Sequence, residues 1–134
     1  MDARGVPLSI VVTGANRHDS TQLEIVLDEI IIERPDDMEQ HLCADKGYSG
    51  EPAIQAIMAR DYIPCVKQRG EEIQEKKLNP DFKARRWVVE ACHSWFNRFR
   101  KLLVRFEKLT ETYLALLHLA AAIIAFRKSG AIYG

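Results

Sequence analysis

The sequence predicts an α/β fold whose C-terminal part is all helical. Between residues 6 and 66, short apolar runs typical of strands alternate with segments of helical spacing. Such alternation favours a layered α/β arrangement, and two longer helical patterns follow at 82–107 and 110–128. The chain has 134 residues, 47% of them hydrophobic and 28% charged, which suits one globular core and is too short for two ordinary domains. Residues 1–134 are therefore predicted to form a single domain.

The first residues read as a tight turn followed by a strand. The turn is expected at Asp2–Gly5, and the alternating apolar residues of Val6–Thr13 predict the strand that leaves it. A hairpin turn has a strand on each side, yet only Met1 precedes this one. We therefore expect an upstream strand in the same sheet. A short N-terminal loop that leads into an edge strand is the alternative.

A helix, a strand and a loop are expected next. Apolar residues at helical spacing predict a helix that is capped by Asp19 or Ser20 and runs to about Glu33. The apolar run His41–Ala44 predicts a short strand, and Asp45–Tyr48 is the loop that leaves it.

One more helix and strand complete the α/β part. Ser49 is the expected N-cap of a helix with apolar residues near positions 54–58. Ile63–Val66 is the expected strand, and Pro64 favours an edge position for it. The polar residues 68–80 are expected to form a loop.

Two long helices are predicted for the C-terminal part. The first runs from about Phe82 to Glu107 with a continuous apolar stripe. The second begins near Thr110, a good N-cap, and ends near residue 128. Its apolar run Tyr113–Phe126 is shorter than the roughly 20 residues that cross a bilayer, so we expect a buried core helix and no membrane partner.

Charge is distributed unevenly along the chain. Residues 1–80 contain 9 Lys and Arg against 15 Asp and Glu, a net charge of −6. Residues 81–134 contain 10 against 4, a net charge of +6. A basic C-terminal part on an acidic body favours a polyanionic partner, although a solvated helix face is the alternative. The three cysteines form no close pair in the sequence, which indicates a reducing, cytoplasmic setting.

Two carboxylates stand out as candidate metal ligands. Asp45 closes the strand His41–Ala44, and ligands of open α/β sheets gather at that edge. Glu90 lies among cationic and polar residues early in the first long helix. Asp45 could instead cap its loop, and Glu90 could form an ordinary helix pair with Arg86. The spacing Glu90-x-x-His93 also occurs in di-iron bundles, but such a site needs the motif twice.

Several ordered motifs together resemble a known family. They are Gly5–Asp19, Ala44–Tyr48, Arg85–Glu90, Trp95–Leu102 and Arg105–Glu107. In this order they resemble the C-terminal part of bacterial insertion-sequence transposases of the DDE type. The resemblance implies a ribonuclease H-like fold, here a truncated sheet with flanking helices. It also implies three carboxylates that bind two divalent cations, normally Mg²⁺, for hydrolysis at transposon ends and strand transfer into target DNA.

The resemblance assigns roles to individual residues. Asp45 matches the second catalytic aspartate and Glu90 the catalytic glutamate, so both are expected to be catalytic metal ligands. Lys83 stands where the family has a tyrosine and Asn97 where it has a lysine, which leaves Arg100 or Lys101 to contact DNA. The full set of expected DNA-binding residues is Arg86, Asn97, Arg98, Arg100, Lys101 and Arg105. The family's first aspartate lies upstream of the turn, and neither Asp2 nor Asp19 matches it.

Three functional hypotheses follow. In the first, the chain is part of a transposase that acts in DNA recombination. It is inactive alone, and it pairs with an upstream fragment of the same enzyme or with a second copy. The second hypothesis is a non-catalytic DNA-binding or regulatory remnant that uses the basic helix 82–107. The third is an unrelated α/β domain whose basic helix contacts protein or lipid.

Overall fold

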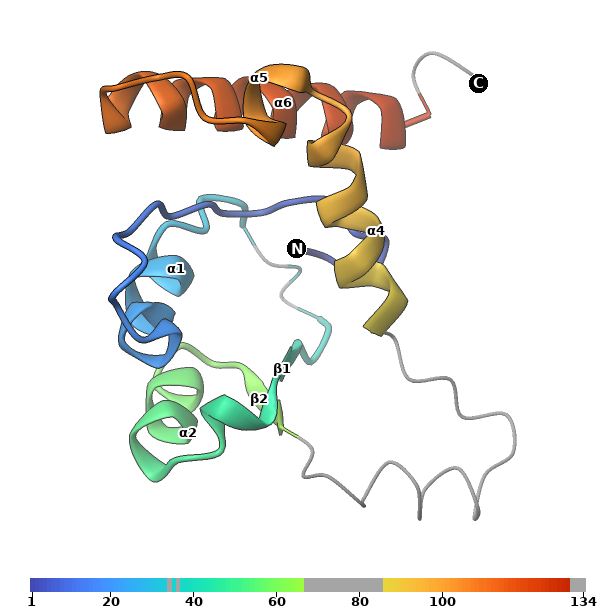
Figure 1. Cartoon of the computed structure of the whole chain (residues 1–134). Helices are drawn as coiled ribbons and strands as arrows, with labels where there is room; N and C mark the ends of the chain where they lie inside the picture. The colour runs from blue at the N-terminus through green and yellow to red at the C-terminus, as the bar shows by residue number, and fades with distance from the viewer. Residues whose placement is uncertain (34, 36, 67–85, 131–134) are drawn as a thin grey trace. The chain divides into compact units, whose positions relative to one another are not determined.

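The computed structural model describes residues 1–33, 35, 37–66 and 86–130, with only the backbone at Arg86 (Figure 1). The predicted loop 68–80 and the predicted start of the long helix at 82–85 lie outside the described residues. The chain divides into two compact units. We call Ala15–Ala84 the central unit, and Met1–Gly14 together with Arg85–Gly134 the terminal unit. The single domain predicted from the sequence stays a prediction.

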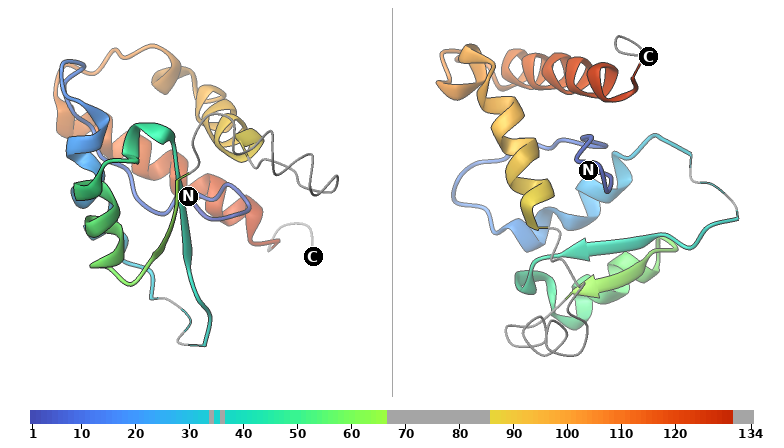
Figure 2. Two further views of the ribbon diagram at one scale, coloured as in Figure 1. Left: turned by 90° about the horizontal axis from the view of Figure 1, so that it is seen from below. Right: turned by 90° about the vertical axis from the view of Figure 1, so that its right-hand side faces the viewer.

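The central unit is a small mixed α/β structure. Its described elements are η1 (Asp19–Gln22), α1 (Leu23–Asp28), β1 (His41–Ala44), η2 (Lys46–Tyr48), α2 (Glu51–Met58) and β2 (Ile63–Val66). The two strands run parallel, with His41 opposite Ile63 and Ala44 opposite Val66 (Figure 2). Both strands agree with the sequence prediction. The α/β class is thus confirmed, while the ribonuclease H-like fold stays a prediction.

A small apolar core holds the central unit together. Leu23 and Leu27 lie one helical turn apart on α1 and are buried with Ile57 of α2. Arg60, just after the end of α2, links this helix to α1 through ion pairs at the surface of the unit. Its guanidinium donates two hydrogen bonds to the Asp28 carboxylate, at 2.6 and 2.8 Å, and one of 3.2 Å to Glu24. The hydrogen bond from Arg60 is the main cause that lowers the pKa of Asp28.

Two helix ends differ from the prediction. The first helix ends at Asp28 instead of Glu33, and the Ile30 N–H donates to the Leu27 carbonyl in a tight turn. Ile30 still packs against the core, but Ile31 is 89% exposed, so the predicted turn beyond Ile30 lacks the tertiary packing that stabilises most helices. The cap of α2 is Gly50 rather than Ser49. Pro52 fits in the first turn of α2, where its missing N–H has no helical partner to lose.

The terminal unit begins with the predicted turn. The Asp2 carboxylate accepts hydrogen bonds from the Arg4 and Val6 N–H groups, at 2.8 and 2.9 Å. Burial alone would raise the pKa of Asp2, but these backbone hydrogen bonds lower it below its usual range. Gly5 has a φ of +84°. The strand predicted for Val6–Thr13 is wrong: the segment forms no strand with any described part of the chain, and a strand needs a hydrogen-bonded neighbour.

Gly5 lets the turn approach helix α4 (Arg86–Asn97) closely. Added to Gly5, a Cβ atom would lie 3.1 and 3.2 Å from two ring carbons of Trp95 and 3.4 Å from a Val88 methyl group. The Lys128 ammonium lies 4.1 Å from the centre of the same Trp95 ring. One aromatic side chain therefore contacts both the N-terminal turn and the end of the last helix.

The long helix predicted for 82–107 is not continuous. Helix α4 ends at Asn97, Phe99 is extended (φ −87°, ψ 103°), and the short helix α5 (Arg100–Leu103) follows. The break turns α5 so that it packs on α6 (Thr110–Lys128). Phe99 and Leu102 then line a hollow of about 220 Å³ with apolar residues of α6. An unbroken helix would carry these two side chains away from that contact.

The last helix has the predicted bounds but not the predicted burial. Its N-cap is Leu109 rather than Thr110. Of its residues only Ala120 and Ile124 are buried, so the expectation of a buried core helix is wrong. Among the described helices, α6 has the length and composition that could cross a membrane. The core helices of soluble proteins pass the same test, so this property alone assigns no membrane role.

Candidate functional site

Asp45 lies at the carboxyl end of β1 with its side chain exposed. Its backbone is extended (φ −65°, ψ 158°), and its carbonyl accepts a 2.9 Å hydrogen bond from the Tyr48 N–H to start η2. The carboxylate makes no capping hydrogen bond. The backbone of Asp45 therefore starts the turn, while its carboxylate oxygens, ligands that suit a hard divalent cation, point to solvent.

The hydroxyl of Tyr48 interacts electrostatically with the carboxylates of both Asp19 and Asp45. The ring of Tyr48 is half-buried against the core of the central unit. Burial raises the pKa of its hydroxyl, and the charges of Asp19 and Asp45 raise it further. The hydroxyl is therefore protonated at neutral pH and can donate a hydrogen bond. The sequence offered Asp19 as a helix cap, but His18 is the N-cap of η1 and forms no side-chain cap.

Glu90 lies on α4, and its side chain is exposed. Val88 and Cys92 are buried on the other side of this helix. Burial raises the pKa of the Cys92 thiol. The helix thus presents Glu90 away from its own apolar contacts, as its angular position predicts. Its predicted partner Arg86 opens α4, and the Arg86 side chain lies outside the described part.

The two candidate carboxylates belong to different units. Asp45 is in the central unit and Glu90 in the terminal unit, and each unit is described by itself. Their convergence on one cation therefore stays a prediction. Among the described residues, no group of three or more His, Cys, Asp or Glu side chains lies close enough to hold a metal ion.

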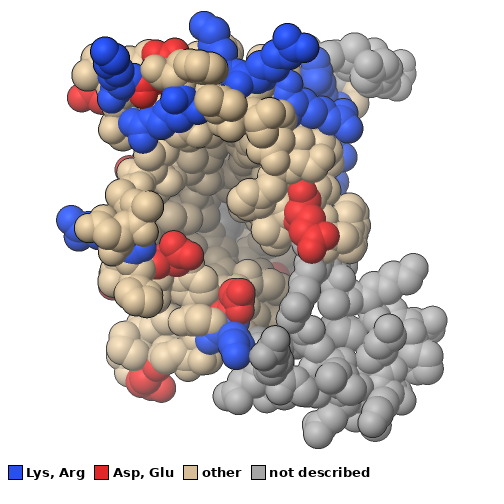
Figure 3. All heavy atoms as spheres, in the orientation of Figure 1, with Lys and Arg blue, Asp and Glu red and all other residues tan. Residues whose placement is uncertain are grey.

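The predicted DNA-binding residues follow the break between α4 and α5. Asn97 ends α4, Arg98 lies in the break, Arg100 and Lys101 begin α5, and all four are exposed. Figure 3 shows Lys and Arg side chains gathered over the α5 and α6 end of the terminal unit. The single basic helix expected from the sequence is therefore replaced by a bent basic segment, residues 97–105.

Arg105 contributes to the fold as well as to this segment. Its guanidinium donates to the Glu107 carbonyl at 3.1 Å and to the Thr110 hydroxyl at 3.3 Å. It also lies 5.0 Å from the centre of the Tyr113 ring. These contacts fix the connection between α5 and α6. The sequence pattern did not indicate this structural role of Arg105.

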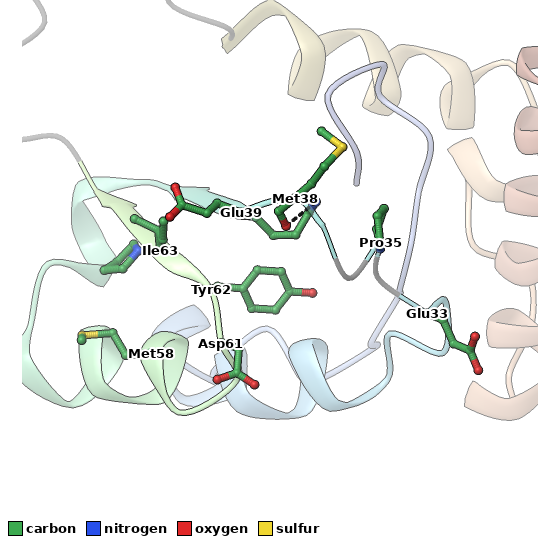
Figure 4. A pocket seen from close by; sticks show the side chains of 10 residues that line it. Glu33, Pro35, Met38, Glu39, Met58, Asp61, Tyr62 and Ile63 are labelled. Carbon is green, nitrogen blue, oxygen red and sulfur yellow. Dashed lines mark hydrogen bonds between the residues drawn. The ribbon is translucent and has the colours of Figure 1, made fainter.

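A hollow of about 900 Å³ in the central unit lies elsewhere. It is lined at the amino ends of β1 and β2, by residues of the α1–β1 segment and of the α2–β2 connection (Figure 4). Its described acidic side chains are Glu33, Glu39 and Asp61. None of the predicted site residues lines it. Asp45 lies at the opposite ends of the strands, so we do not assign this hollow to the catalytic site.

Comparison with known proteins identifies the family. Residues 42–127 match the family described as "Transposase DDE domain", and the chain belongs to this family of DDE transposases. It is also 33% identical over 130 residues to a Burkholderia cepacia protein named "Putative transposase for insertion sequence element IS402". That alignment covers 93% of this chain and 59% of the relative, so the chain spans about three fifths of that relative's length. No solved structure matches the chain. The resemblance to bacterial insertion-sequence DDE transposases is thus confirmed.

Proposed function

We propose that the chain supplies part of the ribonuclease H-like catalytic domain of an insertion-sequence transposase, with Asp45 and Glu90 as two of its metal-binding carboxylates. The observation that carries this proposal is the family match over residues 42–127, which includes both residues. The exposed Asp45 carboxylate at the end of β1 and the exposed Glu90 on α4 support it. The substrates are the DNA ends of the element and its target DNA.

In this proposal each group of residues has a separate task. DDE transposase domains use divalent metal ions, and Mg²⁺ suits carboxylate oxygens. When bound, the cation supplies positive charge that favours attack on a phosphodiester. Asp45 and Glu90 hold it, each from a different element. The cations of segment 97–105 bind the DNA phosphates and fix the position of the scissile bond, because guanidinium groups hold phosphate oxygens bidentately.

The proposed catalytic site is completed by another segment. The family's chemistry uses three carboxylates, and this chain matches two of them. An upstream part of the same enzyme supplies the first aspartate. The 134-residue polypeptide alone is accordingly inactive in Mg²⁺-dependent cleavage and strand transfer.

A non-catalytic DNA-binding role is the second candidate. The exposed cations of segment 97–105 support it, because they need no metal ion to bind a polyanion. A regulatory remnant of this kind binds DNA by charge and has no nuclease activity in any combination.

The first experiment measures DNA binding by the 134-residue chain as a function of salt. Four exposed cations, Arg98, Arg100, Lys101 and Arg105, predict a slope of about −3 to −4 for log K against log [salt]. Lys101→Ala should make this slope shallower by about one. Arg17→Ala, an exposed cation outside the segment, is the matched control and should leave the slope unchanged. A slope near zero, or equal effects of the two substitutions, would contradict the assignment.

The second experiment separates catalysis from binding. The chain is joined to the N-terminal part of the Burkholderia cepacia relative and tested for Mg²⁺-dependent cleavage of transposon-end DNA. Glu90→Gln should abolish cleavage and leave DNA binding intact, whereas Glu111→Gln, another exposed carboxylate, should alter neither. If the completed enzyme cleaves equally well with Glu90→Gln, the role proposed for Glu90 is wrong. If it never cleaves while the chain binds DNA, the second candidate is favoured.

A further inference from the structure

Cys43 and Cys65 are far apart in the sequence but lie opposite each other in the sheet of the central unit. In the register of β1 and β2, the Cα atoms of these two residues are partners. Residues in register on neighbouring parallel strands point their side chains to the same face of the sheet. The structure thus places two thiols side by side, which the spacing of cysteines in the sequence did not indicate.

The thiol pair is on the face of the sheet that points away from the core. Leu42 and Val66, the residues next to the two cysteines, pack against the core of the central unit. Successive residues of a strand point to opposite faces, so Cys43 and Cys65 point the other way. Cys43 is exposed and Cys65 is half-buried. Neither cysteine is among the buried residues of the central unit.

The strand spacing favours an atom held between the sulfurs over a direct bond. Neighbouring strands lie about 4.8 Å apart, and residues in register keep a similar separation at their Cβ atoms. A disulfide needs Cβ atoms about 3.5–4.5 Å apart. An ion between the two sulfurs replaces one S–S bond of about 2.0 Å by two ion–sulfur bonds of about 2.3 Å each, the length of a zinc–sulfur bond, so it spans a wider Cβ separation than a disulfide does.

We propose that Cys43 and Cys65 form a two-thiolate site for a soft, thiophilic ion of the class of trivalent arsenic or Cu(I). Soft thiolate ligands select such ions, whereas the carboxylates proposed for catalysis select hard ones. No group of three or more His, Cys, Asp or Glu side chains among the described residues is close enough to bind a metal. An ion satisfied by two sulfurs therefore fits better than one that needs four protein ligands. The proposal does not depend on transposase activity.

The site is next to the proposed catalytic carboxylate. Cys43 and Asp45 are on the same short segment, since β1 ends at Ala44 and leads directly into Asp45. An ion that bridges Cys43 and Cys65 fixes β1 to β2 at the end from which Asp45 leaves. Occupancy of the soft site would thus restrict the segment that positions a hard-metal ligand.

The test uses phenylarsine oxide with the reduced 134-residue chain. Two As–S bonds form, the arsenic–oxygen bond breaks, and the oxygen leaves as water with both thiol protons, without any change of oxidation state. Mass spectrometry of the intact chain should show one phenylarsenic group per chain, and competition with a small dithiol gives the affinity. Cys43→Ser or Cys65→Ser should weaken binding by about 10²- to 10⁴-fold, because the second bond is no longer intramolecular.

Matched controls distinguish this site from ordinary thiol reactivity. Cys92→Ser, which removes the buried cysteine of the terminal unit, should leave the affinity unchanged. Concentrated urea should lower the affinity of the natural chain, because unfolding removes the register, but it should stay above that of the single variants because the flexible chain still links the two thiols. Far-UV circular dichroism should show that both single variants stay folded, and Cys43→Ala repeats the test without a new hydroxyl. Equal affinity of the natural chain and Cys43→Ser, or full retention in urea, would overturn the proposal.

A second titration distinguishes the two ions of the class. Under anaerobic conditions, Cu(I) held by a coloured chelator should pass to the natural chain and not to Cys65→Ser. If the natural chain takes up Cu(I) and also binds phenylarsine oxide, the site accepts soft ions in general. If it binds phenylarsine oxide but takes up no Cu(I), the site is restricted to arsenic. If neither reagent distinguishes the natural chain from Cys65→Ser, no such site exists.

Discussion

The contact between the N-terminal turn and Trp95 predicts a large effect of Gly5→Ala. At a φ of +84°, any residue other than glycine is strained by about 1–2 kcal/mol. The new methyl group would also lie 3.1 Å from the Trp95 ring, so the ring must move by a few tenths of an ångström. Trp95 is in contact with Lys128 as well, and overpacking of such a site costs about 1–3 kcal/mol. Alanine also lowers the conformational entropy of the unfolded chain, which offsets about 0.4–1 kcal/mol of this loss in stability.

The expected loss in the free energy of unfolding is therefore about 2–4 kcal/mol for Gly5→Ala. Gly130→Ala is the matched control, because Gly130 has a φ of +79° and no atom of the described residues lies within 4 Å of an added Cβ. This control should lose only about 1 kcal/mol, from the backbone alone. Urea unfolding followed by tryptophan fluorescence measures both. If Gly5→Ala costs no more than Gly130→Ala, the close packing of the turn on Trp95 is not a feature of the folded protein.

Two further predictions concern ion contacts. Arg60→Met should destabilise the central unit near neutral pH, because it removes the partner of Asp28. The folded pKa of Asp28 is lowered from 3.8, so this contribution is complete above pH 3.8 and disappears as the pH falls through the folded value. Urea unfolding of both proteins across this range should show the difference narrowing on acidification, and a difference that grows would contradict the prediction. Lys128→Met should lower the stability of the terminal unit by about 0.5–1 kcal/mol through loss of the cation–π contact, and Lys128→Arg should preserve it. Equal losses for the two Lys128 variants in urea unfolding would argue against that contact.

The sequence alone determined the local elements and the family. Apolar spacing and turn residues predict the strands at His41–Ala44 and Ile63–Val66, the turn at Asp2–Gly5 and the helix at 110–128. These signals are local, because each depends on residues within a few positions. The motifs around Asp45 and Glu90 likewise indicated the transposase family that the comparison confirms. The roles of these two residues stay predictions.

Only the tertiary structure decided how distant residues meet. The stripe of 82–107 has helical spacing throughout, yet the chain bends at Phe99 because α5 packs on α6. The first helix stops at Asp28, and after Ile30 the apolar residues Ile31 and Ile32 are exposed. Cys43 is placed beside Cys65 by strand register, and Gly5 beside Trp95 by close packing. The spacing of apolar residues shows which face of a helix or strand is apolar. Which other segment covers that face depends on packing between parts of the chain that are remote in sequence.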